Sequence, residues 1–208
     1  KIVVISLLLS FLTSCNMSVN KSIRIQDGEK VSNSLNTVNG SIHIGNSCEV
    51  IGDCRTVNGS ITVGTNSRVT DLKTVNGSIA IDANVHVEGS LESVNGDIRC
   101  QQNVIINQGI GTINGKIDLT ETTVNDDITT YNGDIILKDG SMVEGDIIIK
   151  KPTGVSGHKR HLDIRIMNGS VVKGNIRVKE EDMNVKVHLG SGGKVNGRVE
   201  NAEILGNI

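Results

Sequence analysis

Asn-Gly pairs recur along this chain at almost constant intervals, and this periodicity limits the fold more than any other feature. The asparagines are separated by 19, 18, 19, 19 and 18 residues and fall at Asn39, Asn58, Asn76, Asn95, Asn114 and Asn132. A repeat of this length is typical of a solenoid, in which a coil buries its apolar face only by stacking on its neighbours. We therefore expect a single elongated domain.

Alignment of the repeats on these asparagines gives columns of constant chemistry. Two apolar columns follow each Asn, two residues apart, and read Ile42, Ile61, Ile79, Ile98, Ile117, Ile135 and Ile44, Val63, Ile81, Cys100, Leu119, Leu137. A spacing of two places both columns on one face of a strand. Apolar columns before each Asn and in mid-repeat predict two more strands per coil, with Asn125 as one polar exception. The pattern predicts an all-β, three-sided β-helix of about nine coils of 18 to 19 residues.

The bends between these strands carry Asn, Gly, Ser and Asp. Asn-Gly suits a bend because both residues tolerate positive φ, and aligned asparagines are able to form an amide ladder along the rod. A hydroxyl column also runs two residues before each Asn, and its members are Thr37, Thr56, Thr74, Ser93, Thr112 and Thr130. The bend interrupts the alternation there, so the pattern leaves the direction of these hydroxyls open.

The repeat continues in both directions beyond the six Asn-Gly pairs. Ile23 and Ile25 match the paired apolar columns when Asn20 is aligned with the Asn column. Toward the carboxyl end the strand pairs persist, interrupted by insertions at Lys150 to Leu162 and Lys179 to Asn184 that we expect to form loops. We predict a signal peptide over 1–14, a lipidated cysteine and short tether over 15–19, and a β-solenoid over 20–208.

The amino terminus carries the pattern of an export signal. An apolar run from Ile2 to Leu12 follows Lys1 and is too short to span a bilayer as a helix. Leu12-Thr13-Ser14-Cys15 resembles the lipobox of bacterial lipoproteins, which implies that Cys15 becomes the first mature residue and carries lipid. We therefore expect a lipid-anchored protein of the bacterial cell envelope, at the outer membrane if the organism is Gram-negative.

The recurring phrases Val-Asn-Gly-Ser-Ile and Gly-Ser-Val-Val-Lys-Gly-Asn-Ile resemble those of two bacterial groups. Residues 35 to 149 resemble a group of adhesins of unknown function, and residues 134 to 200 resemble the bactofilins, polymer-forming cytoskeletal proteins. The resemblance to bactofilins implies a right-handed β-helix that associates end to end, and neither group brings catalytic residues. The export signal and the insertions depart from the bactofilin pattern.

The remaining candidates for chemistry are few. Beyond Cys15, we expect Cys48, Cys54 and Cys100 to be buried small apolar residues, with a Cys48–Cys54 disulfide as an open alternative. The insertion after the repeats groups the basic residues Lys150, Lys151, His158, Lys159, Arg160 and His161. These side chains are candidates for contact with an anionic lipid or glycan, or form a plain solvated loop.

Several function classes are disfavoured by composition. The formal net charge is -2, so nothing attracts the chain to nucleic acid. Asp97 and Asp134 share an outward column two coils apart, but Lys116 lies between them. Tyr131 is the one aromatic residue after the signal region, which leaves little stacking surface for sugars or bases. We expect no enzyme activity and no cofactor or metal.

The sequence therefore predicts a lipid-anchored scaffold that self-associates, or alternatively an adhesin or a module that binds envelope glycan or protein. For self-association, the candidate residues lie at the carboxyl-terminal end and are Ile204, Leu205 and Ile208.

Overall fold

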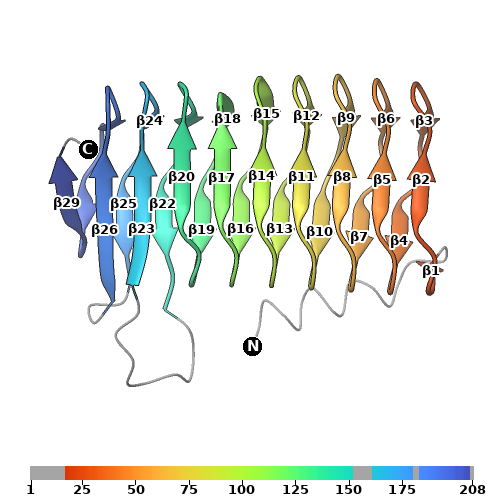
Figure 1. Cartoon of the computed structure of the whole chain (residues 1–208), viewed down its shortest axis with the longest axis horizontal. Coiled ribbons are helices and arrows are strands. Elements are labelled where there is room, and N and C mark those ends of the chain that lie inside the picture. The colour runs from red at the N-terminus through yellow and green to blue at the C-terminus, as the bar shows by residue number, and fades with distance from the viewer. Residues whose placement is uncertain (1–16, 152–160, 180–182, 207–208) are drawn as a thin grey trace.

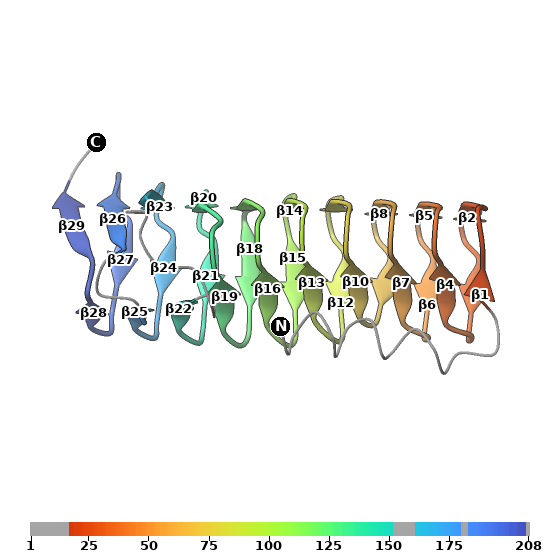
Figure 2. The same ribbon diagram turned by 90° about the horizontal axis from the view of Figure 1, so that it is seen from below.

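The computed structural model describes residues 17–151, 161–179 and 183–206, and every regular element in these ranges is a β-strand. The strands wind into a rod with three long faces, in which each coil contributes one strand to each face (Figures 1 and 2). The faces are parallel sheets of ten, ten and nine strands, which we call sheets A, B and C. The predicted three-sided β-helix is confirmed.

Sheet A has its ten strands in chain order: β1 (Met17–Ser18), β4 (Leu35–Thr37), β7 (Cys54–Thr56), β10 (Leu72–Thr74), β13 (Leu91–Ser93), β16 (Ile110–Thr112), β19 (Ile128–Thr130), β22 (Ile147–Ile149), β25 (Ile176–Val178) and β28 (Val199–Glu200). Sheet B follows the Asn-Gly bends: β2 (Ile23–Ile25), β5 (Ile42–Ile44), β8 (Ile61–Val63), β11 (Ile79–Ile81), β14 (Ile98–Cys100), β17 (Ile117–Thr120), β20 (Ile135–Lys138), β23 (His161–Ile166), β26 (Asn184–Leu189) and β29 (Glu203–Gly206). Sheet C contains the shortest strands: β3 (Lys30–Val31), β6 (Glu49–Val50), β9 (Arg68–Val69), β12 (His86–Val87), β15 (Val104–Ile106), β18 (Thr122–Val124), β21 (Met142–Val143), β24 (Val171–Val172) and β27 (Lys194–Val195).

The strand register places identical aliphatic residues directly above one another. In sheet B, for example, Ile98 pairs with Ile79 on one side and Ile117 on the other, and all three are fully buried. Burying one such side chain contributes about 1.5–3 kcal/mol, and β-branched residues fit the pleated surface of a strand. The apolar columns of the three sheets meet in one continuous core along the rod.

The mid-repeat column has no polar exception, contrary to the sequence expectation at Asn125. Val124 pairs with Ile106 on one side and with Val143 on the other, while Asn125 is exposed. The coil that begins at Asn114 has 18 residues and is one residue shorter before sheet C, so the apolar position falls one residue earlier than a fixed offset from Asn114 predicts. Core packing, and not the residue count, therefore sets the register of sheet C.

The hydroxyl column faces inward. Its six members are almost fully buried, and three threonine hydroxyls donate hydrogen bonds of 2.7–2.9 Å to carbonyl oxygens at the neighbouring bend. Thr56 Oγ1, for instance, donates to the carbonyl of Gly40 at 2.7 Å. The column therefore closes the corner between sheets A and B from inside and forms no external surface.

The sequence predicts positive φ at the Asn-Gly bends, and this prediction is wrong: no residue of the six Asn-Gly pairs has a positive φ. Positive φ is found instead at Asn66, Asn84, Asn103 and Asn168, at the corner between sheets B and C, and near the two ends of the rod at Asn20 and Asn201. Glycine is needed in the Asn-Gly pair for a steric reason, because a Cβ at Gly59 would lie 2.0 Å from the carbonyl oxygen of Gly40. The coils approach closest along this line of glycines, and any side chain there would separate them.

The boundaries of the solenoid also differ from those predicted. Met17 and Ser18 already pair with Asn36 and Thr37, so the regular structure begins inside the region expected to be a tether. At the first insertion, Leu162 is a buried residue of β23 and not part of a loop.

Candidate functional site

The structure does not bring the predicted site residues together in one place. Cys15, His158, Lys159, Arg160 and Ile208 lie outside the described residues. Lys150 directly follows β22 on sheet A, whereas His161 begins β23 on sheet B. Lys151 is exposed beside Lys150.

His161 belongs to a polar cluster on the outer face of sheet B. Its Nε2 lies 3.1 Å from Asp163 Oδ1, which lies equally close to His188 Nε2, and Arg165 donates to Asp163 Oδ2 at 2.8 Å. Burial opposes ionisation of Asp163, but the His188 hydrogen bond and the nearby positive charges hold its pKa below the usual value. The contact between Asp163 and His188 links β23 to β26. The imidazole of His161 is paired with the same carboxylate.

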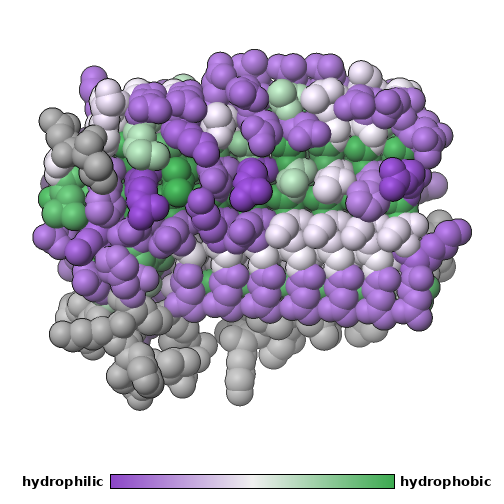
Figure 3. Space-filling model, viewed as in Figure 1, coloured by the Kyte–Doolittle hydropathy of each residue, from purple (hydrophilic) through white to green (hydrophobic). Residues whose placement is uncertain are grey.

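The asparagine side chains form a ladder along the edge between sheets A and B. Each Nδ2 donates to the Oδ1 of the asparagine one coil earlier, over 2.6–2.9 Å, from Asn39 bonded to Asn20 up to Asn132 bonded to Asn114. The ladder is visible as a regular hydrophilic row along the lower edge in Figure 3. Because each amide donates in one direction and accepts from the other, the ladder links seven coils in series.

The carboxyl-terminal end of the rod is open over the described residues. Strands β27, β28 and β29 are the last strands of their sheets. Ile204 pairs with the fully buried Val187, yet 53% of its own surface is exposed. Val195 and Val199 also occupy core columns and are only partly buried, while Leu205 is half-buried. The core columns therefore end in aliphatic side chains without a covering coil in the described part of the chain.

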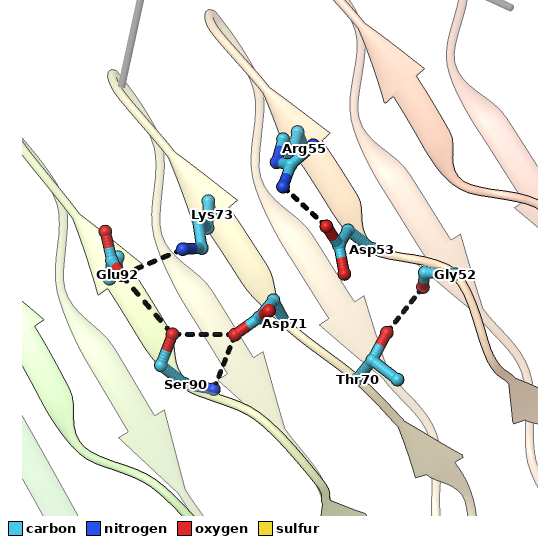
Figure 4. A network of polar contacts seen from close by, with 8 residues as sticks. All are labelled: Gly52, Asp53, Arg55, Thr70, Asp71, Lys73, Ser90 and Glu92. Atoms are coloured by element: carbon cyan, nitrogen blue, oxygen red, sulfur yellow. Dashed lines mark hydrogen bonds and ion pairs between the residues drawn. The ribbon is translucent and has the colours of Figure 1, made fainter. Parts of the chain in front are cut away.

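The outer face of sheet A carries a polar network that ends at a gap in the side-chain cover. Lys73 Nζ donates a hydrogen bond to Glu92 Oε1 at 3.0 Å (Figure 4). Ser90 Oγ donates to Asp71 Oδ1 at 2.7 Å and lies 3.3 Å from Glu92 Oε1. These contacts join two successive coils and orient the Glu92 carboxylate.

Beside Glu92, strand β16 carries no outward side chain, because its one outward-facing position is Gly111, and the residue before the strand is also a glycine. Gly111 pairs with Glu92 on one side and Thr129 on the other, and Gly109 precedes the strand. The resulting pocket, which we call the β16 notch, has a volume of about 340 Å³. Its polar and aromatic lining residues are Ser90, Glu92, Ser93, Thr112, Asp126, Asp127, Thr129, Tyr131 and Lys150. The aligned repeats could have indicated this pocket, because Gly111 is the only glycine in the column that contains Arg55, Lys73, Glu92 and Thr129.

The three described cysteines are unpaired and buried, so the alternative of a Cys48–Cys54 disulfide is not what the structure shows. Burial raises the pKa of the Cys54 thiol to about 12 and raises that of Cys100 as well. Both thiols are therefore neutral and shielded, as expected of small apolar residues in a core column.

The two aspartates considered for catalysis, Asp97 and Asp134, and the nearby Asp118 are engaged in contacts between coils. Asp134 Oδ1 accepts a hydrogen bond from the backbone N–H of Asp163 at 2.9 Å. Asp97 Oδ1 accepts a hydrogen bond from the backbone N–H of Lys116 at 2.9 Å. Asp118 lies between Lys116 and Lys138, at 3.1 and 2.8 Å. Burial opposes ionisation of Asp118, but its hydrogen bonds to the two lysines lower its pKa.

Within residues 17–151, 161–179 and 183–206, no group of three or more histidine, cysteine, aspartate or glutamate side chains is arranged to hold a metal ion. The same ranges contain no helix with the length and hydropathy needed to cross a membrane. Comparisons with family models, curated proteins and solved structures give no match. The resemblance to bactofilins and adhesins stays a prediction from the sequence.

Proposed function

We propose that this protein is a non-enzymatic scaffold of the bacterial cell envelope, anchored through lipid on Cys15, whose copies join at the carboxyl-terminal end of the rod. The observation that carries this proposal is the open end formed by β27, β28 and β29, where Ile204 occupies a core column but is 53% exposed. A solenoid coil is stabilised by the coils on both sides of it. A second copy would supply a neighbour for β27, β28 and β29.

The geometry of the sheets favours pairing of two carboxyl-terminal ends. Within the described residues, β27, β28 and β29 are the last strands of their sheets and lie at the same end of the rod (Figure 2), and such strand edges readily accept further strands. A lipid on Cys15 would hold the opposite end at a membrane, since β1 begins two residues later at Met17. Two copies related by a two-fold axis at the open end would pair their terminal strands antiparallel and bury Ile204 against the partner.

The anchor itself rests on the lipobox resemblance at Cys15. One acyl chain binds a membrane only marginally, so durable attachment requires the several chains that bacterial lipoproteins carry. Metabolic labelling with a radioactive fatty acid tests this part separately: Cys15→Ser should abolish labelling, and labelling that persists would contradict the anchor.

Self-association is tested by sedimentation velocity of the chain from residue 16 over a wide range of concentrations. We expect a monomer–dimer equilibrium that Ile204→Glu shifts strongly toward monomer, because a carboxylate would replace the apolar contact. Ile51→Glu is the matched control, since Ile51 is 51% exposed on the side of the rod. A wild-type chain that stays monomeric at all concentrations, or equal effects of the two substitutions, would contradict the proposal.

The alternative, a binding module that uses the basic insertion, has a narrower basis in the structure. Leu162 is in the core, and His161 contacts Asp163, so only residues up to 160 could form a separate basic loop. Deletion of residues 152–160 tests it, with binding of the protein to anionic lipid vesicles as the measurement. Loss of vesicle binding with unchanged dimerisation would favour this alternative.

A further inference from the structure

The β16 notch is a feature that the fold does not require. Most glycines of this rod either adopt positive φ or lie where a Cβ would collide with the adjacent coil. Gly111 does neither, since its φ is not positive and a Cβ there would meet only Glu92 Cγ, at 3.8 Å. A glycine in the middle of a strand weakens that strand, and its usual justification is the close approach of another backbone or a ligand.

Among the described residues, no backbone lies within 4 Å of the position that a Cβ at Gly111 would take. The neighbouring glycine, Gly109, differs in this respect, because a Cβ there would lie 2.6 Å from the carbonyl oxygen of Asp127. Gly109 is therefore explained by the close approach of a neighbouring coil, whereas Gly111 is not. The bare position instead opens a pocket of about 340 Å³, which is at the lower end of the range for small-molecule sites.

The groups around the notch define the chemistry of a ligand. Glu92 lies on β13 and Asp127 directly precedes β19, so the two residues line the notch from opposite sides of β16. Glu92 is oriented by Lys73 and Ser90, and Asp127 Oδ1 already accepts from the backbone N–H of Asp146 at 2.7 Å. Both residues line the notch, so carboxylate oxygens that are not engaged in these contacts can accept hydrogen bonds from a ligand.

The rest of the lining combines apolar residues such as Val94 and Ile113 with hydroxyl side chains, Tyr131 and Lys150. Tyr131 and Lys150 stand one above the other at the end of the notch nearest the Asn ladder, following the paired strands β19 and β22. Tyr131 supplies an aromatic ring to the lining of the notch, and aromatic rings pack well against flat apolar surfaces. Three carboxylates against one lysine disfavour a phosphate or another anion.

We propose that the β16 notch binds a neutral saccharide unit. A pyranose ring presents hydroxyl donors around its edge for Glu92 and Asp127, and an apolar C–H face for Tyr131. One aromatic ring is enough for one sugar, so the scarcity of aromatic residues does not exclude this ligand. The proposal does not depend on self-association, because the notch lies on the side of the rod and the open end lies beyond β26.

The site can be closed without disturbing the fold. Gly111→Thr places a β-branched side chain where the aligned residue of the next coil is already Thr129, and the available space accommodates its Cβ. Ala80→Thr is the matched control, because Ala80 occupies an outward position on a central strand of sheet B. Both variants should melt at or above the temperature of the wild-type protein.

The probes are the methyl glycosides of glucose, galactose, mannose and N-acetylglucosamine. Saturation-transfer NMR on the full chain detects binding, and the fluorescence of Tyr131, which is the sole tyrosine in a chain without tryptophan, reports the notch directly. We expect at least one glycoside to bind, with an affinity lowered at least about tenfold by Gly111→Thr and unchanged by Ala80→Thr.

The role of the ring is tested separately, with Tyr131→Phe expected to retain binding and Tyr131→Leu to lose it. Failure of all four glycosides to bind at millimolar concentration would overturn the proposal. Equal affinity in wild type and Gly111→Thr would overturn it too, as would preferential binding of a lysine-rich peptide. None of these outcomes bears on dimerisation through Ile204.

Discussion

The stacked core predicts a large and position-dependent cost for truncating one isoleucine, and Ile98 is the most informative site. Ile98 is fully buried between Ile79 and Ile117. Ile98→Ala removes three carbons, which at about 0.8 kcal/mol each amounts to about 2.4 kcal/mol before the cavity is counted. Because the neighbouring coils are fixed by their own ladders, the cavity should persist and bring the total to about 3–5 kcal/mol.

The assay is urea unfolding followed by far-ultraviolet circular dichroism, since the chain contains no tryptophan. Ile98→Val should cost about 1 kcal/mol, and Arg99→Ala, on the exposed face of the same strand, should stay within about 0.5 kcal/mol. The equivalent change at the open end, Ile204→Ala, should cost less than Ile98→Ala because Ile204 is half exposed. Equal costs at residues 98 and 99 would refute the stacked core.

Three further predictions concern the bends, the thiols and the carboxylates. Gly77→Ala should lower the melting temperature by several degrees because a Cβ would lie 2.0 Å from the Gly59 carbonyl oxygen, whereas Gly111→Ala should not lower it. Cys54 and the other two buried thiols of the chain from residue 16 should react with a thiol reagent at pH 8 only after unfolding. The pKa of Asp118 is lower in the folded protein than its unfolded value of about 4, so the ionised carboxylate stabilises the fold above about pH 4. This stabilisation is lost as the pH falls through the folded pKa. In urea titrations, Asp118→Asn should therefore reduce the loss of unfolding free energy in acid.

The architecture could be predicted because the contacts between coils of a solenoid recur at a fixed separation in the sequence. Residues that touch between coils are separated by one repeat, so the pairing of Ile42 with Ile61 follows directly from spacing. The columns failed only where a coil changed length. Around Asn125, the fixed offset pointed to the exposed residue, and the packing requirement selected Val124.

The direction of the hydroxyl column was also available in the sequence. Leu35 and Thr37 are two residues apart and therefore share a face of β4, so the buried leucine implies an inward threonine. The bend begins only after this pair. Inward hydroxyls are acceptable in an apolar core because the neighbouring bend supplies carbonyl acceptors for them, as Gly40 does for Thr56.

The β16 notch was harder to predict from sequence. A glycine is common in these repeats, and its meaning depends on whether a Cβ would collide with another coil, which only the structure shows. The same applies to the open end. Spacing assigns Ile204 to the column of Val187, but its exposure depends on what lies beyond it.

Electron microscopy of the chain from residue 16 tests the scaffold most directly, by measuring the length of individual particles. Nine coils at about 4.8 Å per coil give a single rod of about 43 Å, and association through the open end should produce particles of twice that length and unchanged width. Ile204→Glu should return them to the single length. Particles that double in width, or that keep the single length at every concentration, would contradict association at β27, β28 and β29.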